Sequence, residues 1–171
     1  MDWFDALLKR ATEAIAPRYF ALPIDGRDYP AYRERVYCYE LYHQLRKLWP
    51  DGCPYSLCGE VDKRKHPYFG TNDPKPDFIV HVPGQHDNYA VIEVKRPEAR
   101  AGDIRNDIEK LSMFRRSPAH YNRGIYLIYG ENPTQVQERL LECVGDPARL
   151  EGLELWVHPE VQVSAQRVSL S

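Results

Sequence analysis

Residues 76–95 read PDFIVHVPGQHDNYAVIEVK, a stretch with two apolar runs separated by a loop. The runs, residues 77–82 and 89–95, have the length of β-strands and are rich in β-branched and aromatic side chains. The loop between them, residues 83–88, contains Pro, Gly, Asp and Asn, which favour chain reversal. The sequence therefore predicts a β-hairpin.

Burial determines the register expected for this hairpin. With Asp77 opposite Glu93, one face is entirely apolar and consists of Phe78, Val80, Ala90 and Ile92. The pairs expected on the other face are Ile79–Val91 and His81–Tyr89. A one-residue slip would move Asp77 into the core opposite Val94, at a desolvation cost of roughly several kcal/mol. The favoured register therefore brings Asp77, Glu93 and Lys95 onto one face.

Helical periodicity and turn residues predict the elements before the hairpin. In chain order they are a helix over 3–15, a connector over 16–30, a helix over 32–49, a strand over 55–63 and a loop over 63–76. Asp2 is the expected N-cap of the first helix, and Pro50 follows the end of the second.

After the hairpin we expect two more helices and three more strands. They are a helix over 103–116, a buried strand over 124–130, a helix over 133–144 with Asn132 as N-cap, and edge strands over 153–158 and 161–168. A right-handed crossover makes the strands before and after the first of these helices parallel.

The predicted fold class is α/β, with a mixed central sheet flanked by helices on both sides. We expect one domain, in which 1–31 form an N-terminal helix and connector, 32–158 the core, and 159–171 a C-terminal edge segment.

Composition narrows the expected functions. The 171 residues carry a formal net charge of −2, so a nucleic-acid role must depend on local charge. Four cysteines are scattered without a secretory signal or an apolar run of membrane-spanning length. These features predict reduced thiols, a cytoplasmic location and no membrane association.

Two carboxylates that converge beside a lysine indicate a divalent-cation site. Mg²⁺ prefers oxygen ligands and retains several waters, so two carboxylates and a substrate phosphate suffice to bind it. Such an ion lowers the pKa of bound water and offsets charge on a phosphoryl oxygen. A nearby lysine could orient or deprotonate that water, or stabilise the transition state.

The segments KPDFIVHV (75–82) and YAVIEVKRP (89–97) resemble the PD-(D/E)XK signature of the restriction-endonuclease-like nuclease superfamily. The order of elements over 32–158 is similar to the αβββαβ core of that fold. The resemblance implies that Asp77 and Glu93 ligate Mg²⁺, for which Mn²⁺ can substitute. It also implies that the backbone carbonyl of Val94 assists and that Lys95 is catalytic.

Many members of the superfamily carry a further glutamate on the helix before the sheet. At about 100° per residue, Glu34 lies about 20° from Leu41, within the inward stripe of the helix over 32–49. Glu40 lies about 100° from Leu41, at the edge of that stripe. We favour Glu34 as the helix ligand and retain Glu40 as the alternative, with Glu60 as a weaker third candidate.

Local basic charge adds candidates for nucleic-acid binding. The first group is Lys63, Arg64 and Lys65, the second is Arg96 and Arg100 with Arg105, and the third is Arg115 with Arg116. We expect all three to surround the hairpin.

The sequence thus predicts a Mg²⁺-dependent nuclease that hydrolyses DNA, suited to prokaryotic restriction, phage defence or repair. A homodimer or a partner subunit would supply target recognition. The alternative is a catalytically silent nuclease-fold protein that serves as a nucleic-acid-binding or scaffold subunit. No glycine-rich phosphate loop or nucleophile–base motif supports a small-molecule enzyme.

Overall fold

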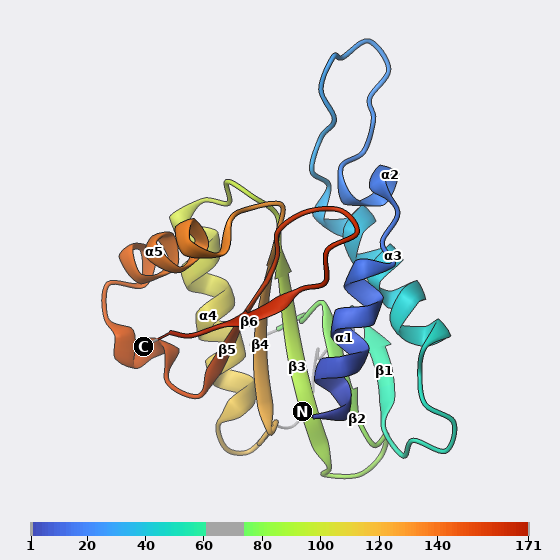
Figure 1. Cartoon of the computed structure of the whole chain (residues 1–171). Coiled ribbons are helices and arrows are strands. Elements are labelled where there is room, and N and C mark those ends of the chain that lie inside the picture. Colours follow the sequence, from blue (N-terminus) through green and yellow to red (C-terminus); the bar gives the residue numbers. More distant parts are fainter. Residues whose placement is uncertain (1, 61–73, 171) are drawn as a thin grey trace.

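A mixed β-sheet forms the centre of the protein (Figure 1). The computed structural model describes residues 2–60 and 74–170, and within these ranges six strands follow one another across the sheet in chain order. They are β1 (Ser56–Gly59), β2 (Phe78–His81), β3 (Asn88–Lys95), β4 (Arg123–Tyr129), β5 (Leu153–His158) and β6 (Gln166–Val168). The pairs β3–β4 and β4–β5 are parallel and the others antiparallel. The predicted α/β class with a mixed sheet is confirmed.

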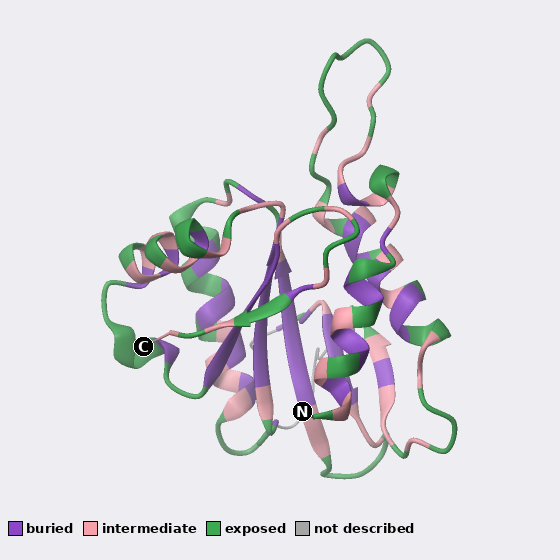
Figure 2. Cartoon of the chain, viewed as in Figure 1, coloured by how far each residue is buried: buried purple, intermediate pink, exposed green. Residues whose placement is uncertain are grey.

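Helices cover both faces of this sheet, and the central strands between them are buried (Figures 1 and 2). The helices are α1 (Trp3–Glu13), α2 (Pro17–Phe20), α3 (Glu34–Lys47), α4 (Ala101–Arg115) and α5 (Pro133–Val144), with a 3₁₀ turn η1 (Pro147–Leu150). Helices α1 and α3 share a core with Val80 and Ile92, whereas α4 and α5 share one with Ile79 and Val91. Alternate residues of β2 and β3 therefore face opposite helical layers. No helix in the described ranges has the length and apolar character needed to cross a membrane.

The register of the hairpin β2–β3 agrees with the prediction up to one irregularity. Its observed pairs are Phe78–Ile92, Ile79–Val91, Val80–Ala90 and His81–Asn88. The first three are the expected pairs, and the fourth differs because the register shifts between Val80 and His81. The expected pairing of His81 with Tyr89 is wrong, because the bulge adds a residue on the β3 side.

The second half of the sheet contains the predicted parallel crossover, in which α4 joins β3 to β4. The prediction that 153–158 is an edge strand is wrong. Strand β5 pairs with β4 on one side and with β6 on the other, and all six of its residues are buried. The edge is formed by β6, a shorter segment than the expected 161–168.

Most helix boundaries lie within two residues of those predicted. The Asp2 side chain caps α1 by accepting a hydrogen bond from the Phe4 amide at 2.8 Å, and α5 begins at Pro133 after the Asn132 N-cap. Helix α3 begins only at Glu34, because the chain before it is extended and Leu22 pairs with Ala31. The paired segments form an arm that projects from the body (Figure 1). The expected loop 63–76 and the end of the expected strand 55–63 lie largely outside the described residues.

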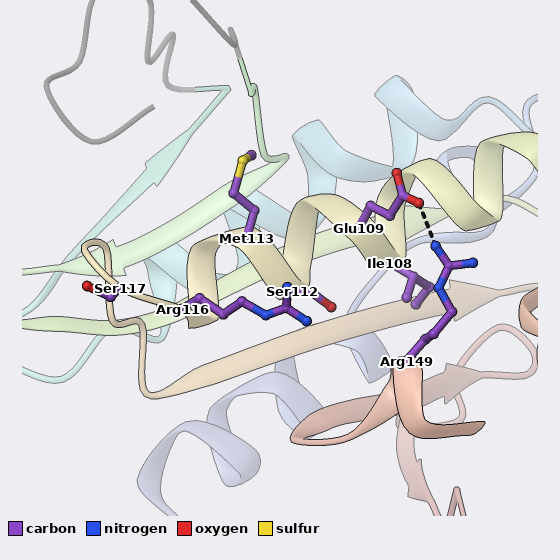
Figure 3. Close-up of a pocket in the computed structure, with 7 residues that line it drawn as sticks. All are labelled: Ile108, Glu109, Ser112, Met113, Arg116, Ser117 and Arg149. Carbon is purple, nitrogen blue, oxygen red and sulfur yellow. Dashed lines mark hydrogen bonds and ion pairs between the residues drawn. The ribbon is translucent and has the colours of Figure 1, made fainter. Parts of the chain in front are cut away.

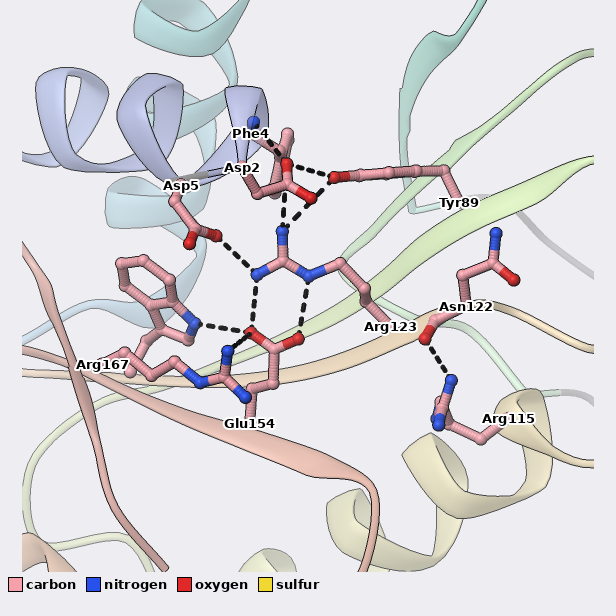
Figure 4. Close-up of polar contacts among 10 residues, drawn as sticks. Asp2, Phe4, Asp5, Tyr89, Arg115, Asn122, Arg123, Glu154 and Arg167 are labelled. Carbon is pink, nitrogen blue, oxygen red and sulfur yellow. Dashed lines mark hydrogen bonds and ion pairs between the residues drawn. The ribbon is translucent and has the colours of Figure 1, made fainter.

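An arginine whose side chain is 10 % exposed joins α1 to the middle of the sheet (Figure 4). Arg123 at the start of β4 donates to Glu154 of β5 from Nε at 2.8 Å and from Nη2 at 2.6 Å. The same Nη2 lies 2.7 Å from Oδ1 of Asp5 in α1. Burial raises the pKa of Glu154, but the hydrogen bonds from Arg123 and Trp156 outweigh it, so its pKa is lowered. Glu154 is therefore a carboxylate whose charge depends on Arg123.

The other end of β5 carries a buried histidine that lies against a tyrosine hydroxyl. The His158 side chain is fully buried, its Nδ1 lies 2.8 Å from the Tyr37 hydroxyl, and its ring meets Phe20 edge-on at 4.8 Å. Burial lowers the pKa of His158 from 6.5 to about 4. The folded protein therefore holds this imidazole neutral at neutral pH.

Because the unfolded chain binds this proton between about pH 6.5 and 4 and the folded protein does not, the stabilising contribution of His158 is lost as the pH falls. The stability of the wild type relative to His158→Gln is expected to fall by roughly 2–3 kcal/mol between pH 7.5 and pH 4.5. Urea unfolding of both proteins at several pH values measures this difference. Groups other than His158 titrate in both proteins, so their effects on stability cancel. A difference that does not change with pH would contradict the lowered pKa.

Candidate functional site

The residues of the motif lie at the carboxyl end of β3, on the face that α4 covers. Glu93 and Lys95 share this face with Val91, which belongs to the α4 core. Tyr126 of β4 is the register partner of Glu93, and Asp77 precedes β2 on the other side of β3. The site therefore occupies the end of three adjacent strands.

Asp77 is fixed against the Glu-Val-Lys triplet by a direct hydrogen bond. Its Oδ2 accepts from the backbone N–H of Val94 at 2.7 Å, and its own carbonyl accepts from the Glu60 amide at 2.9 Å. Because the backbone ladder of β2 begins only at Phe78, the carboxylate satisfies an amide that the strand leaves unpaired. Burial raises the pKa of Asp77 to about 6, and the negative charge of Glu34 adds to this effect.

Glu93 is buried, with 2 % of its surface exposed. Its Oε2 lies 2.9 Å from Nζ of Lys110, a residue of α4. Its Oε1 is buried and has no hydrogen-bond partner among the described residues. Burial, together with the negative charge of Asp77, raises the pKa of Glu93 well above its usual value. Glu93 is thus a carboxylate with one oxygen paired and one oxygen still to be satisfied.

Lys95 lies between carboxylates from both helical layers. Its Nζ is 2.8 Å from Oδ2 of Asp107 in α4 and 3.4 Å from Oε1 of Glu34 at the start of α3. Burial alone would lower the pKa of Lys95, but the pairing with Asp107 and Glu34 raises it overall. The other oxygen of Asp107 lies 3.5 Å from Lys110, so this one carboxylate links both lysines.

The structure separates the two candidates for the helix acid. Glu34 reaches Lys95 and also accepts a hydrogen bond from the Arg96 amide at 3.3 Å through Oε2. Glu40 instead accepts a hydrogen bond from Gln44, one turn further along the same helix, at 2.6 Å. The third candidate, Glu60, pairs with Arg35 at 3.3 Å on an exposed surface. Of these three acids, Glu34 is the one that the structure brings against Lys95.

Three residues of the site were not predicted: Asp107, Lys110 and Tyr126. Asp107 lies within the inward stripe of α4, between Ile104 and Ile108, and an acid in that position is a signal that the sequence contains. The Tyr126 hydroxyl is buried without a hydrogen-bond partner in the described part of the chain. Burial raises its pKa well above the usual value, and the nearby acids, Asp107 first, add to the increase.

The predicted nucleic-acid contacts are distributed more widely than expected. Lys63, Arg64 and Lys65 lie outside the described residues. Arg96 and Arg100 are exposed and follow β3 directly, next to the acids. Arg105 is exposed on α4, and its side chain donates to the Cys143 carbonyl of α5 at 3.1 Å.

Arg115 and Arg116 lie near the turn end of the hairpin rather than beside its acids. Helix α4 runs antiparallel to β3, so its C-terminal residues lie at the opposite end of the sheet. There Arg115 donates to the Tyr121 carbonyl at 2.8 Å, just before β4 begins. Arg116 lines a separate pocket of about 510 Å³ between α4 and η1, together with Arg149, which pairs with Glu109 at 2.6 Å (Figure 3).

The carboxylate oxygens of the site suit a metal cation that keeps most of its bound water molecules. In the described ranges no group of three or more His, Cys, Asp or Glu residues is arranged to hold a metal ion. Asp77 and Glu93 alone offer two carboxylates, and the buried Oε1 of Glu93 is an oxygen that a cation would satisfy. Mg²⁺ commonly uses one or two carboxylates with waters and a substrate phosphate. The formal charge of the site also favours a bound cation, because its four acids outnumber its two lysines. The acids are Glu34, Asp77, Glu93 and Asp107, and the lysines are Lys95 and Lys110.

Comparison with known proteins adds no relative: no protein-family model, no curated protein and no solved structure matches the chain.

Proposed function

We propose that the protein is a Mg²⁺-dependent nuclease with a restriction-endonuclease-like core that hydrolyses phosphodiester bonds in DNA. The observation that carries this proposal is the hydrogen bond from the Val94 amide to Asp77, which gathers Asp77, Glu93 and Lys95 at one end of the sheet. The order α3–β1–β2–β3–α4–β4 also supports it, because it follows the αβββαβ order expected for that fold.

Asp77, Glu93 and the Val94 carbonyl would hold the ion, with Glu34 close to them. The bound ion would lower the pKa of a water molecule and offset negative charge on the phosphate, and Mn²⁺ would substitute for Mg²⁺. Hydrolysis adds that water to phosphorus and breaks one P–O bond, and the leaving oxygen takes up a proton. Lys95, with two carboxylates beside its Nζ, would act as a cationic hydrogen-bond donor to the water or the phosphate.

The test is cleavage of supercoiled plasmid DNA by the purified protein. We expect nicking with Mg²⁺ or Mn²⁺, no nicking with EDTA, and none by Lys95→Ala. Lys47→Ala, which removes the same charge from an exposed position of α3, should cleave as the wild type does. Cleavage that survives Lys95→Ala would overturn the proposal.

A second function is favoured by one observation. Three acids of the site, Glu34, Glu93 and Asp107, are already paired with Lys95 or Lys110, so the cluster can also serve as an internal ion-pair network. The protein would then be a catalytically silent subunit that binds nucleic acid or a partner. DNA binding without cleavage, unaffected by Lys95→Ala and Asp77→Ala, would favour this function.

Lys110 gives a prediction for metal affinity. Its ammonium group lies 2.9 Å from Oε2 of Glu93 and therefore opposes a cation at the same carboxylate. We expect Lys110→Met to tighten Mn²⁺ binding about tenfold, because a hydrogen bond to a charged group is worth about 1.5–3 kcal/mol. Titration calorimetry without DNA measures the affinity, and Lys47→Met is the control for net charge. Unchanged affinity would show that the ion does not bind next to Glu93 Oε2.

The cellular role follows from the same proposal. A second copy of the chain or a partner subunit would supply target recognition. Restriction, phage defence and DNA repair are the settings that suit such a nuclease.

A further inference from the structure

A second cavity adjoins the acids on the side of α3. Its volume is about 320 Å³, and its lining residues are Cys38, Tyr39, Tyr42, Gly59, Glu60, Asp77 and Phe78. Asp77 belongs both to this lining and to the acid cluster. The pKa of Cys38 is raised well above its usual value by burial and, next, by the negative charge of Asp77, which agrees with this proximity. The cavity therefore meets the candidate catalytic site at Asp77.

Aromatic rings form much of the lining. The rings of Tyr42 and Phe78 are nearly parallel, at 18° and 6.3 Å between centroids, and the Tyr42 hydroxyl lies 3.4 Å from the Leu57 carbonyl. These contacts fix Tyr42 in place. Tyr39 is different, because 61 % of its surface is exposed. One ring is thus held rigidly, and the other is free to cover a bound planar group.

Charged groups occupy the rim of the same cavity. Arg35 precedes Tyr39 by four residues on α3, so the two side chains project from one face of the helix. Arg35 is 68 % exposed and pairs with Glu60 at 3.3 Å. A pair this exposed contributes little and is readily exchanged for a phosphate. The surface beside Asp77 therefore combines a cavity lined largely by aromatic rings with a cation at its edge.

We propose that this cavity binds one unpaired base of the DNA strand whose phosphate lies at the acid cluster. The inference rests on the proposed nuclease function and specifies its substrate as single-stranded or locally unpaired DNA. A base within a duplex is stacked and paired and cannot enter such a cavity unless it leaves the helix. Aromatic side chains stack on any base, so we expect little sequence preference from this contact.

The test compares binding of a single-stranded oligonucleotide and of its duplex, measured by fluorescence anisotropy with Ca²⁺ in place of Mg²⁺. The wild type should bind the single strand more tightly. Tyr39→Ala should weaken single-strand binding about tenfold, the loss expected for one stacked base, and leave duplex binding unchanged. Tyr39→Phe should retain the affinity, because the ring and not the hydroxyl makes the contact.

Tyr29→Ala is the matched control, because Tyr29 is 68 % exposed and does not line this cavity. Single-strand binding that is equal in the wild type and Tyr39→Ala, or a preference for duplex, would overturn the base pocket. Cleavage that requires Asp77 but is indifferent to Tyr39 would overturn the pocket and leave the nuclease proposal standing. Tyr39-dependent binding without cleavage under any metal would support the pocket and overturn the nuclease.

Discussion

Replacement of Asp77 by asparagine is expected to abolish DNA cleavage, with a loss on the order of 10³-fold or more, because charge stabilisation by a bound cation is worth several kcal/mol. Asparagine keeps an oxygen that can accept the hydrogen bond from Val94, so the local backbone is preserved. What is lost is the negative charge that the cation requires. Plasmid nicking and Mn²⁺ titration of the same preparation measure both consequences.

The same substitution is expected to stabilise the fold. Burial raises the pKa of Asp77 to about 6 from 3.8, so the folded protein binds this proton more tightly than the unfolded chain does. The unfavourable contribution is therefore absent at low pH and present in full above pH 6. Asp77→Asn should gain roughly 2–3 kcal/mol in unfolding free energy at pH 8, and the gain should shrink as the pH falls through 6.

Asp103→Asn, at an exposed position in the first turn of α4, is the control; it should leave activity unchanged and lower stability by at most about 0.5–1 kcal/mol. An Asp77→Asn protein that still cleaves DNA would contradict a role for this carboxylate in holding a metal. A protein that is inactive and also less stable at pH 8 would show that Asp77 acts through the fold.

Replacement of Arg123 by methionine is expected to cost about 3–5 kcal/mol of unfolding free energy, the range for breaking a buried ion pair by removing one partner. Glu154 would keep Trp156 Nε1 at 3.1 Å and the exposed Arg167 at 3.7 Å, while losing both hydrogen bonds from Arg123. Asp5 would lose its contact as well, which loosens α1 from the sheet (Figure 4). Urea unfolding at pH 7.5 measures the loss.

Adding Glu154→Gln to Arg123→Met removes the carboxylate charge that has lost its partner. The double variant should recover more than about 1 kcal/mol of unfolding free energy, since residues in direct contact couple by up to about 3 kcal/mol. Arg105→Met is the control, because Arg105 is exposed and donates a hydrogen bond to the Cys143 carbonyl. A cost below about 1 kcal/mol for Arg123→Met would show that Glu154 finds another partner or takes up a proton.

The pairing of the two hairpin strands could be predicted from the sequence, because one face of the hairpin is entirely apolar and the other carries the charged side chains. Phe78 and Ile92 pair as expected, since the alternative register would bury a carboxylate. That register places Asp77 beside the Glu-Val-Lys triplet, whereas its hydrogen bond with the Val94 amide was not predicted. The bulge after Val80 could not be predicted, because the turn residues that follow allow more than one way of closing the hairpin.

The contribution of α4 was only partly contained in the sequence. Asp107 could have been identified from its place in the inward stripe between Ile104 and Ile108. Lys110 could not, because its contact with Glu93 depends on how closely α4 packs against β3 and on the reach of a long side chain.

The pairing of the last strands in the sheet was also not predicted. The position of β5 between β4 and β6 depends on how the last segment pairs, through Leu155 with Val168, and short apolar runs do not specify their partners. The place of Arg115 at the far end of the sheet follows only once the direction of α4 is known.

The position of Lys95 between Glu34 and Asp107 has a consequence for when the protein can be active. These carboxylates come from helices on opposite sides of the sheet, so the lysine is held only after both helices have docked. During synthesis α3 emerges well before α4, and an incomplete chain would present the hairpin acids without the arrangement that orients Lys95. Under the proposed nuclease function, nascent and partly unfolded chains would therefore lack the arrangement needed to cleave DNA.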